Sequence, residues 1–272
     1  MRQQKLKSGF SEENYRDYLN FCKSTGLPYT VLKSNYTLEI VSDFCNIKFA
    51  PNMGKKAFIA GAMIKRDIKN SGVIAPDIDS EKLTYFNFAP DSRLQTCDKE
   101  IYNIDIKSAY ASVLYQHSLI TTKTANYLKT LSKKDRLACV GMLAAKKEVF
   151  TMVAGKPMTA TKIINENAPF FYFCINRTNE IMHKCQMEIG HHFLFYWVDG
   201  IFFNGANNVP KVCAVLDKLG YRYSVDVCTD IVYSDSGKCR RLSYNKGEEK
   251  KELSLPKKNN AIDEFLINFL YF

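Results

Sequence analysis

The sequence lacks several features that define common protein classes. Its nine cysteines form no C-x-x-C pair and are odd in number, so neither a zinc knuckle nor a disulfide framework is expected. No stretch of about 18 residues is both apolar and uncharged, so no membrane-spanning helix is predicted. The first ten residues contain no apolar signal-peptide core. Scattered thiols are typical of a reducing compartment, and together these absences predict a cytoplasmic protein.

The composition is that of a folded protein with a basic surface. The 272 residues suffice for one large domain or two small ones. Hydrophobic residues make up 46% of the chain and charged residues 24%, which excludes wholesale disorder. There are 38 Lys and Arg against 28 Asp and Glu, a net charge of +10. An excess of this size favours a polyanionic partner such as nucleic acid.

Local patterns predict a mixture of helices and strands. Helical spacing and capping signals predict a first helix that begins near Ser11 and a second over 109–116, after Ser108. The same signals predict two basic helices within 123–156 and single helices over 165–185, 209–219 and 261–272. The aromatic run 170–173 is predicted to be core strand that leads into its helix. Alternating apolar residues predict strands at 29–32, 36–41, 47–50, 101–106 and 223–232, and a hairpin over 193–203. The charged segment 245–260 is predicted to be a linker. This order is typical of an α+β fold with a mostly antiparallel sheet and helices on one face.

Two aspartates stand out in this pattern. Asp105 ends a predicted strand, where it could simply cap the next helix, and Asp199 with Gly200 has the pattern of a two-residue hairpin turn. One acid at a strand end and another at a hairpin tip can also meet at one edge of a sheet. Two such carboxylates can hold two divalent ions about 4 Å apart for phosphoryl transfer, and oxygen ligands suit Mg²⁺ or Mn²⁺. The basic stretch between them would offer charge to a triphosphate and a nucleic-acid backbone.

The segments around both aspartates resemble motifs of family B DNA polymerases. Residues 105–112, DIKSAYAS, resemble motif A, D-x-x-S-x-Y-P-S, with matches at Asp105, Ser108, Tyr110 and Ser112 and with alanine in place of the proline. Residues 195–200, FYWVDG, resemble motif C, Y-x-D-T-D-S, with Asp199 on the second aspartate. The first aspartate, the threonine and the serine of that motif are replaced by Trp197, Val198 and Gly200.

Three weaker matches follow the same order along the chain. Residues 136–144 are similar in spacing to motif B, which puts Arg136 in the place of the triphosphate-binding lysine. Residues 58–62 resemble the Y-x-G-G segment that touches template, with Gly61 as the matching glycine. Residues 238–244 resemble the K-x-Y segment that grips the primer, with Lys238, Arg241 and Tyr244 as candidate nucleic-acid contacts.

The resemblance implies a mechanism and a set of roles. Asp105 and Asp199, with the backbone carbonyl of Ile106, would bind two Mg²⁺ or Mn²⁺ ions. Ser108 would lie near the triphosphate, and Tyr110 would underlie the incoming sugar. A primer 3′-hydroxyl would attack the α-phosphate of a dNTP and release pyrophosphate, mainly through positioning and charge neutralisation. The implied partners are dNTPs and a DNA primer-template.

The resemblance also implies a reduced polymerase. It places the palm at 99–119 and 165–235, short helical fingers at 120–164, a small α/β region at 1–98, and a basic linker with a thumb remnant at 236–272. The first hundred residues leave no room for a proofreading exonuclease, and a partner protein would supply missing thumb or priming functions. A phage or mobile-element origin, in a bacterial host cytoplasm, fits so small an enzyme.

Two alternatives fit the same residues. A reverse-transcriptase-like palm also has an aromatic residue five positions after its first aspartate, as Tyr110 follows Asp105, and an aromatic-x-D-D motif that residues 197–200 match in part. A non-catalytic nucleic-acid-binding module would keep the basic surface without the chemistry.

Overall fold

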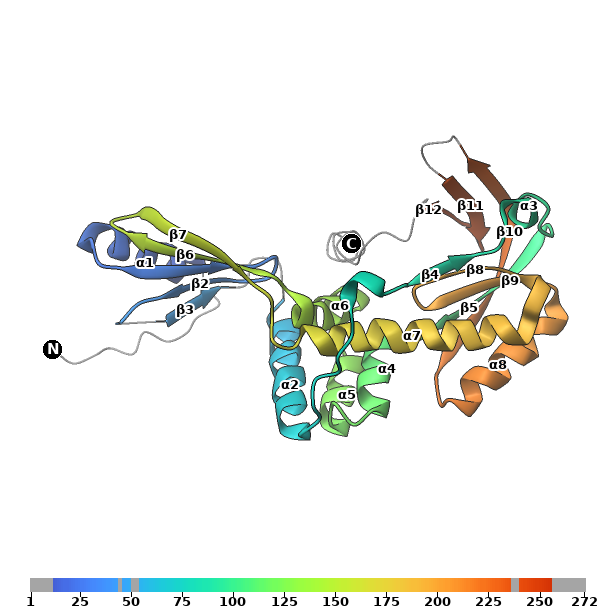
Figure 1. Ribbon diagram of the computed structural model, residues 1–272, viewed down its shortest axis with the longest axis horizontal. Helices are drawn as coiled ribbons and strands as arrows, with labels where there is room; N and C mark the ends of the chain where they lie inside the picture. Colours follow the sequence, from blue (N-terminus) through green and yellow to red (C-terminus); the bar gives the residue numbers. More distant parts are fainter. Residues whose placement is uncertain (1–11, 44–45, 50–53, 236–239, 256–272) are drawn as a thin grey trace. The chain divides into compact units, whose positions relative to one another are not determined.

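The computed structural model describes residues 12–43, 46–49, 54–235 and 240–255 (Figure 1). Contacts divide the chain into two compact units. The first unit comprises Met1–Pro76, Ser118–Phe171 and Asn268–Phe272, and the second comprises Asp77–His117 and Tyr172–Ile267. Each unit contains its own antiparallel sheet, and each is described by itself.

The sheet of the first unit has five strands in the order β3-β2-β1-β6-β7. Its strands are β1 (Tyr29–Lys33), β2 (Leu38–Val41), β3 (Asn46–Phe49), β6 (Lys147–Val153) and β7 (Lys156–Ile163). Helix α1 (Glu12–Thr25) covers one face, because its tyrosines recur at helical spacing and pack on alternate residues of the strands. The shared core contains Tyr15, Tyr18, Cys22, Tyr29, Ile40 and Ile47.

The first unit also holds a group of helices. These are α2 (Lys55–Ser71), α5 (Thr122–Lys129), α6 (Lys133–Gly141) and the 3-10 turn η2 (Met142–Ala144). The side chains of Thr121 and Ser132 accept hydrogen bonds from backbone N–H groups at the starts of α5 and α6. Gly72 ends α2 in the left-handed conformation, with φ of 67°.

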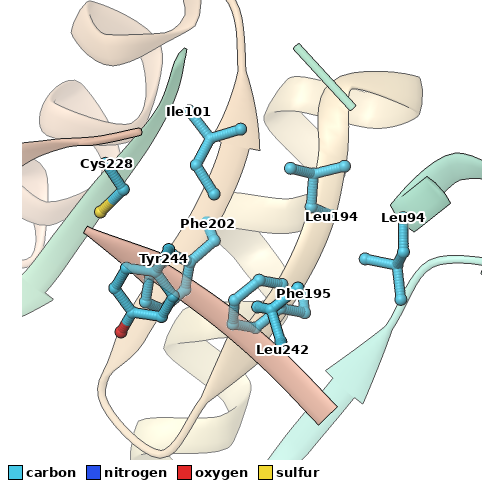
Figure 2. Packing of buried hydrophobic residues seen from close by; sticks show 8 residues of the cluster. All are labelled: Leu94, Ile101, Leu194, Phe195, Phe202, Cys228, Leu242 and Tyr244. Carbon is cyan, nitrogen blue, oxygen red and sulfur yellow. The ribbon is translucent and has the colours of Figure 1, made fainter. Parts of the chain in front are cut away.

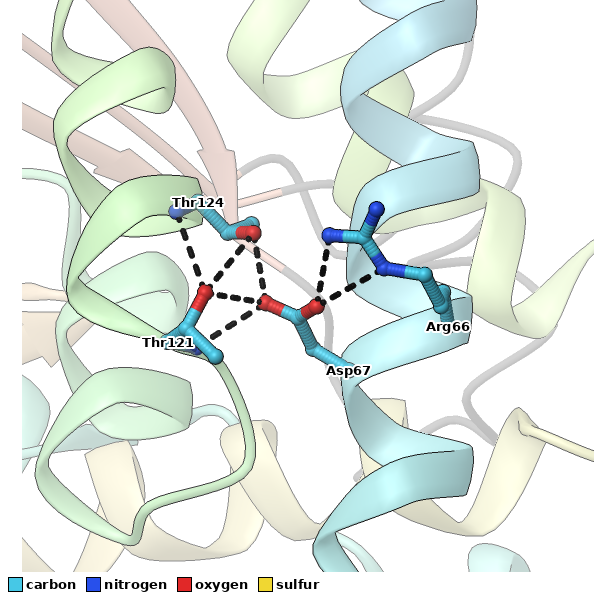
Figure 3. Close-up of polar contacts among 4 residues, drawn as sticks. All are labelled: Arg66, Asp67, Thr121 and Thr124. Carbon is cyan, nitrogen blue, oxygen red and sulfur yellow. Dashed lines mark hydrogen bonds and ion pairs between the residues drawn. The ribbon is translucent and has the colours of Figure 1, made fainter.

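A buried carboxylate joins α2 to the start of α5. Asp67 Oδ2 accepts hydrogen bonds from the Thr121 hydroxyl at 2.7 Å, the Thr121 backbone N–H at 2.9 Å and the Thr124 hydroxyl (Figure 3). Its Oδ1 accepts from Arg66 at 3.0 Å. Burial raises the pKa of Asp67, but these hydrogen bonds outweigh it and lower the pKa to about 2.

The sheet of the second unit has seven strands in the order β12-β11-β10-β5-β9-β8-β4. The strands are β4 (Phe86–Phe88), β5 (Glu100–Ile106), β8 (Phe193–Trp197), β9 (Gly200–Asn204), β10 (Tyr223–Asp235), β11 (Arg240–Lys246) and β12 (Glu249–Leu255). The helices are α3 (Asp91–Gln95), α4 (Ala109–Gln116), α7 (Ala168–Ile189) and α8 (Val209–Lys218). The boundary between the two units falls within α7. Short 3-10 turns lie at Ser80–Lys82, Gly190–His192 and Ala206–Asn208.

The two faces of this sheet differ in what they pack against. On one face, Tyr196 of β8 donates a hydrogen bond to Asn179 of α7, and Tyr223 of β10 donates one to Asp217 of α8. The other face carries an apolar cluster with α3 against it (Figure 2). That cluster contains Leu94, Ile101, Leu194, Phe195, Phe202, Cys228, Leu242 and Tyr244. Long helices therefore cover one face, whereas Asp105 lies on the other by alternation from Ile101.

Most of the expected elements are confirmed, and so is the α+β class with antiparallel sheets. Three expectations are wrong. Residues 147–153 form β6 rather than helix, because Val149, Phe150 and Met152 pair with β1. Residues 170–173 lie inside α7 rather than in a strand. Residues 245–255 are paired strand rather than linker. Helix α2 has no counterpart among the expected elements. The expected helix at 261–272 lies outside the described residues.

The two units also differ from the expected division of the chain. Residues 77–98 belong with the second unit because β4 pairs with β8, and β11 and β12 extend the same sheet beyond residue 235. Residues 118–171 belong with residues 1–76, because β6 pairs with β1. Among the residues that the structure describes, no helix combines the length and apolar character needed to cross a bilayer.

Candidate active site

Asp105 and Asp199 come from neighbouring strands of the second sheet. In the pairing of β5 with β9, Asp105 stands opposite Gly200, the residue directly after Asp199. The backbone N–H of Ile106 donates a hydrogen bond of 2.9 Å to the carbonyl of Asp199. The structure therefore brings the two predicted aspartates to one edge of the sheet.

The hairpin that carries Asp199 turns one residue earlier than expected. Trp197 pairs with Gly200, so Val198 and Asp199 form the turn and Gly200 begins β9. Val198 has a φ of 55°, a left-handed conformation that a β-branched side chain rarely adopts. Its backbone N–H donates a 2.7 Å hydrogen bond to Tyr85, which holds the turn in place.

A second left-handed residue stands beside Asp105. Ser108 has φ of 55° and ψ of 47° at the N-cap of α4, and its side chain makes no capping hydrogen bond. It therefore does not cap the helix as predicted, but its conformation turns the chain sharply from β5 into α4. Strained residues persist where the surrounding structure fixes them, and they gather at functional sites. Here Ser108 and Val198 flank the two aspartates.

The absence of a side chain at Gly200 lets the Asp105 and Asn103 side chains lie directly against its backbone. A Cβ atom at position 200 would lie 3.2 Å from Asp105 Oδ1 and 3.2 Å from Asn103 Nδ2. Both side chains therefore lie over the Gly200 backbone, on the face opposite α7 and α8. This close packing positions the half-buried carboxylate of Asp105 beside the turn that carries Asp199.

Tyr110 follows from the first turn of α4 and is buried. Burial raises the pKa of its phenol well above 10, and the negative charge of Asp199 raises it further. The phenol therefore stays protonated near Asp199. The Cys174 thiol of α7 donates to the Tyr110 carbonyl at 3.7 Å, which ties α4 to the long helix.

Two charged residues that the sequence patterns did not single out lie on the same face as Asp105. Asp226 of β10 stands opposite Asn103 of β5. The Nζ atom of Lys246, from β11, lies 2.8 Å from Asp226 Oδ2. Burial lowers the pKa of Lys246, but the hydrogen bond and charge of Asp226 and the charge of Asp105 outweigh it and raise the pKa. Lys246 therefore responds to both carboxylates. The alternation of polar residues along 224–230 is the signal that could have revealed Asp226.

Lys246→Gln is expected to destabilise the protein more than Asp226→Asn does. Removing the lysine leaves the half-buried Asp226 unpaired and removes a cation from Asp105, at a cost of about 1 to 3 kcal/mol. Removing Asp226 leaves Lys246 with Asp105 as a second partner. Urea unfolding of both variants and the double variant measures the two losses and their coupling. Equal losses from the two single variants would contradict the shared role of Lys246.

The other predicted residues of this unit differ in how they relate to this group. Tyr244 is buried in the apolar cluster, edge-on to Phe202 at 5.4 Å between ring centroids. Burial raises the pKa of its phenol, and the charges of Asp105 and Asp226 raise it further, so Tyr244 lies near both carboxylates. Arg241 lies on the opposite side of β11 from Tyr244 by alternation, where its side chain is exposed and 3.8 Å from Glu252. The two residues therefore do not form one contact surface. Lys238 lies outside the described residues.

Two predicted residues lie in the first unit. Gly61 is buried inside α2, where a Cβ would meet Met142 Sδ at 2.7 Å, so this glycine allows α2 to pack closely on the end of α6. That packing explains the glycine without a contact to template. Arg136 of α6 donates a hydrogen bond to the carbonyl of Leu131 just before its own helix.

The chemistry available at the second sheet is that of hard oxygen ligands. Within the described ranges, no group of three or more His, Cys, Asp or Glu side chains is arranged to hold a metal ion. Asp105 and Asp199 offer two carboxylates at the ends of neighbouring strands, and carboxylates with backbone carbonyls and water are the ligands that Mg²⁺ prefers. The residues present therefore fit a hydrated divalent ion better than an all-protein metal cage.

Comparison with known proteins adds no assignment. No protein-family model matches the chain, and no curated protein is significantly similar to it in sequence. The likeness to family B polymerases therefore rests on the short motifs described above.

Proposed function

We propose that the protein is a DNA polymerase-type nucleotidyltransferase that resembles family B enzymes and adds dNTPs to a 3′-hydroxyl, with the sheet of the second unit as its palm. The observation that carries the proposal is the pairing of Asp105 with Gly200, which puts the acids of two separate motifs at one sheet edge. Helices lie on one face of this sheet and Asp105 on the other. The order of motifs along the chain agrees with this arrangement.

Asp105, Asp199 and the carbonyl of Ile106 would hold two Mg²⁺ or Mn²⁺ ions. When bound, such ions neutralise phosphate charge and assist the attacking and leaving oxygens. Gly200 lets the Asp105 carboxylate lie close over the strand that follows Asp199. The neutral, buried Tyr110 lies close enough to Asp199 to respond to its charge, and it would shape the floor under the incoming sugar.

The proposal includes a partner for the parts that the chain lacks. The second unit contains the strands β11 and β12 where a longer polymerase has a thumb. A hairpin of this length offers little surface to hold a duplex, so processive synthesis would need a partner protein. The proposed enzyme has no proofreading exonuclease and is expected to add few nucleotides per binding event.

Primer extension tests the proposed activity. Wild-type protein with Mg²⁺ or Mn²⁺ is expected to add labelled dNTPs to a primer on a DNA template, and Asp105→Asn is expected to add none. Parallel lanes with an RNA template, with no template and with rNTPs distinguish a copying DNA polymerase from a reverse-transcriptase-like enzyme and from a terminal transferase. A chelator lane shows whether incorporation requires the metal.

Asp98→Asn is the matched control, because Asp98 precedes the same strand and makes the same change of charge. Its incorporation should equal that of wild type. Incorporation at the wild-type level by Asp105→Asn would contradict the proposal. DNA binding without incorporation, equal in wild type and Asp105→Asn, would indicate the non-catalytic binding module instead.

A further inference from the structure

The positive charge of the protein belongs entirely to the first unit. This unit contains 21 Lys and Arg against 9 Asp and Glu, a formal charge of +12. The second unit contains 17 Lys and Arg against 19 Asp and Glu, a formal charge of −2. A polyanion attracted by the net charge is therefore drawn to the first unit, not to the unit that holds the two aspartates.

One face of the five-stranded sheet is exposed toward β6 and β7, whereas Phe58 and Lys65 of α2 lie beside its other end. Helix α1 packs on the face that presents Tyr29, Ile40 and Ile47. The alternate residues point to the other face, and the strand registers align them in two rows across all five strands. The rows are Asn46, Val41, Thr30, Thr151, Thr159 and Lys48, Glu39, Leu32, Val149, Thr161. The threonines of β6 and β7 are exposed, so this face offers hydroxyl donors to solvent.

Three lysines gather at this face. Lys48 of β3 and Lys147 of β6 lie on it by alternation, and Lys65 of α2 interacts electrostatically with both. Lys48 lies 3.6 Å from Glu39 and 5.7 Å from the centre of the Phe58 ring. Three ammonium groups near two carboxylates, Glu39 and Glu166, leave a local excess of positive charge.

We propose that this face binds the phosphate backbone of a nucleic acid, with Lys48, Lys65 and Lys147 on phosphates and the threonine hydroxyls as further donors. The inference deepens the proposed function, because it names the surface that holds the polymer while the second unit performs the chemistry. The face presents hydroxyls and aliphatic side chains instead of an aromatic platform. Binding is therefore expected to be independent of sequence.

The protonation of Lys65 predicts that binding to the phosphate backbone depends on pH. Burial lowers the pKa of Lys65, the charges of Lys147 and Lys48 lower it further, and Glu166 and Glu39 offset part of this, which leaves it at about 8. A phosphate beside this lysine favours the charged form, so binding takes up a proton. Affinity is therefore expected to be full below pH 8 and to weaken as the pH rises through 8 toward 9.

The test measures binding of the full chain to labelled DNA by fluorescence anisotropy, in EDTA and without nucleotides. Lys65→Gln/Lys147→Gln is expected to bind at least about fivefold more weakly than wild type in 100 mM salt. Its log–log salt slope should be shallower by about 1.4 with single strands or about 1.8 with duplex, since two phosphate contacts are lost. The difference in DNA affinity between pH 7 and pH 9 should also be smaller for this variant than for wild type.

Lys123→Gln/Lys129→Gln is the control, because it removes the same charge from exposed positions of α5 in the same unit. An equal loss in both variants would overturn the proposal, since net charge alone would then explain binding. Vesicles of phosphatidylserine form a separate arm. Loss of vesicle binding with unchanged DNA binding in Lys65→Gln/Lys147→Gln would also overturn it. Because the assay contains neither metal nor dNTPs, its result does not depend on whether the protein is a polymerase.

Discussion

Asp199→Asn is expected to reduce metal-dependent dNTP incorporation at least about 1,000-fold and to leave the fold intact. A metal ligand at the reacting phosphate stabilises the transition state by several kcal/mol, and each 1.36 kcal/mol is a factor of ten in rate. The turn of the β8–β9 hairpin tolerates asparagine, which has nearly the same shape as aspartate and is common in turns. Single-turnover incorporation and thermal unfolding measure the two effects separately.

The charge change itself has a matched control in Asp230→Asn. Asp230 lies in the same sheet, is exposed, and has a φ of 54°, a conformation that asparagine adopts readily. This variant should keep wild-type incorporation. If Asp105 and Asp199 act on the same ions, the double variant Asp105→Asn/Asp199→Asn should incorporate dNTPs no more slowly than either single variant. Additive losses would contradict a shared site, and an active Asp199→Asn would make Asp199 a turn residue alone.

The short-range signals of the sequence predicted much of the fold. Helix α1 follows from its acidic first turn and its apolar spacing, and β5 and the β8–β9 hairpin follow from alternation. These elements are set by residues close in sequence. That is why Asp105 and Asp199 could be placed at a strand end and a hairpin turn without the structure.

The errors concern elements whose identity depends on distant partners. The basic residues spread over 123–156 favour helices throughout that segment, but Val149 and Phe150 pair with β1, more than 100 residues away. The charged run 249–252 forms β12 because β11 offers it a paired edge. Its mixed charges gave no sign of a strand without that partner. In both cases pairing with a distant strand outweighs the local preference of the sequence.

The site shows the same limit. Asp226 and Lys246 lie 121 and 141 positions after Asp105, and only the register of β10 with β5 and β11 brings them near it. Motif matching also gave no sign of the packing role of Gly61, since a glycine needed for close helix packing is indistinguishable in sequence from one that contacts a ligand. Residues that packing requires can thus match the pattern of a functional motif.

Asp67→Asn is expected to destabilise the first unit by about 2 to 4 kcal/mol. The carboxylate accepts hydrogen bonds from Thr121, Thr124 and Arg66, and an amide replaces one of its acceptor oxygens with a donor (Figure 3). A buried donor then faces the guanidinium or the threonine hydroxyls. Urea unfolding at pH 7 measures the loss. Asp135→Asn, at a half-exposed carboxylate that accepts only from the Ser132 hydroxyl among the bonds described, is the control and should change stability less.

The acid limb of the stability curve provides an independent check of the Asp67 network. The pKa of Asp67 is about 2 when folded, whereas an unfolded aspartate has a pKa of about 3.9. Above about pH 4 both states are ionised, and the contribution of roughly 2 kcal/mol is complete. As the pH falls from 4 toward 2 the unfolded chain takes up the proton first, so the stabilisation is lost over that interval. The stability difference between wild type and Asp67→Asn should therefore narrow below pH 4. A difference that stays constant down to pH 2 would show that the carboxylate acts through its shape and not through its charge.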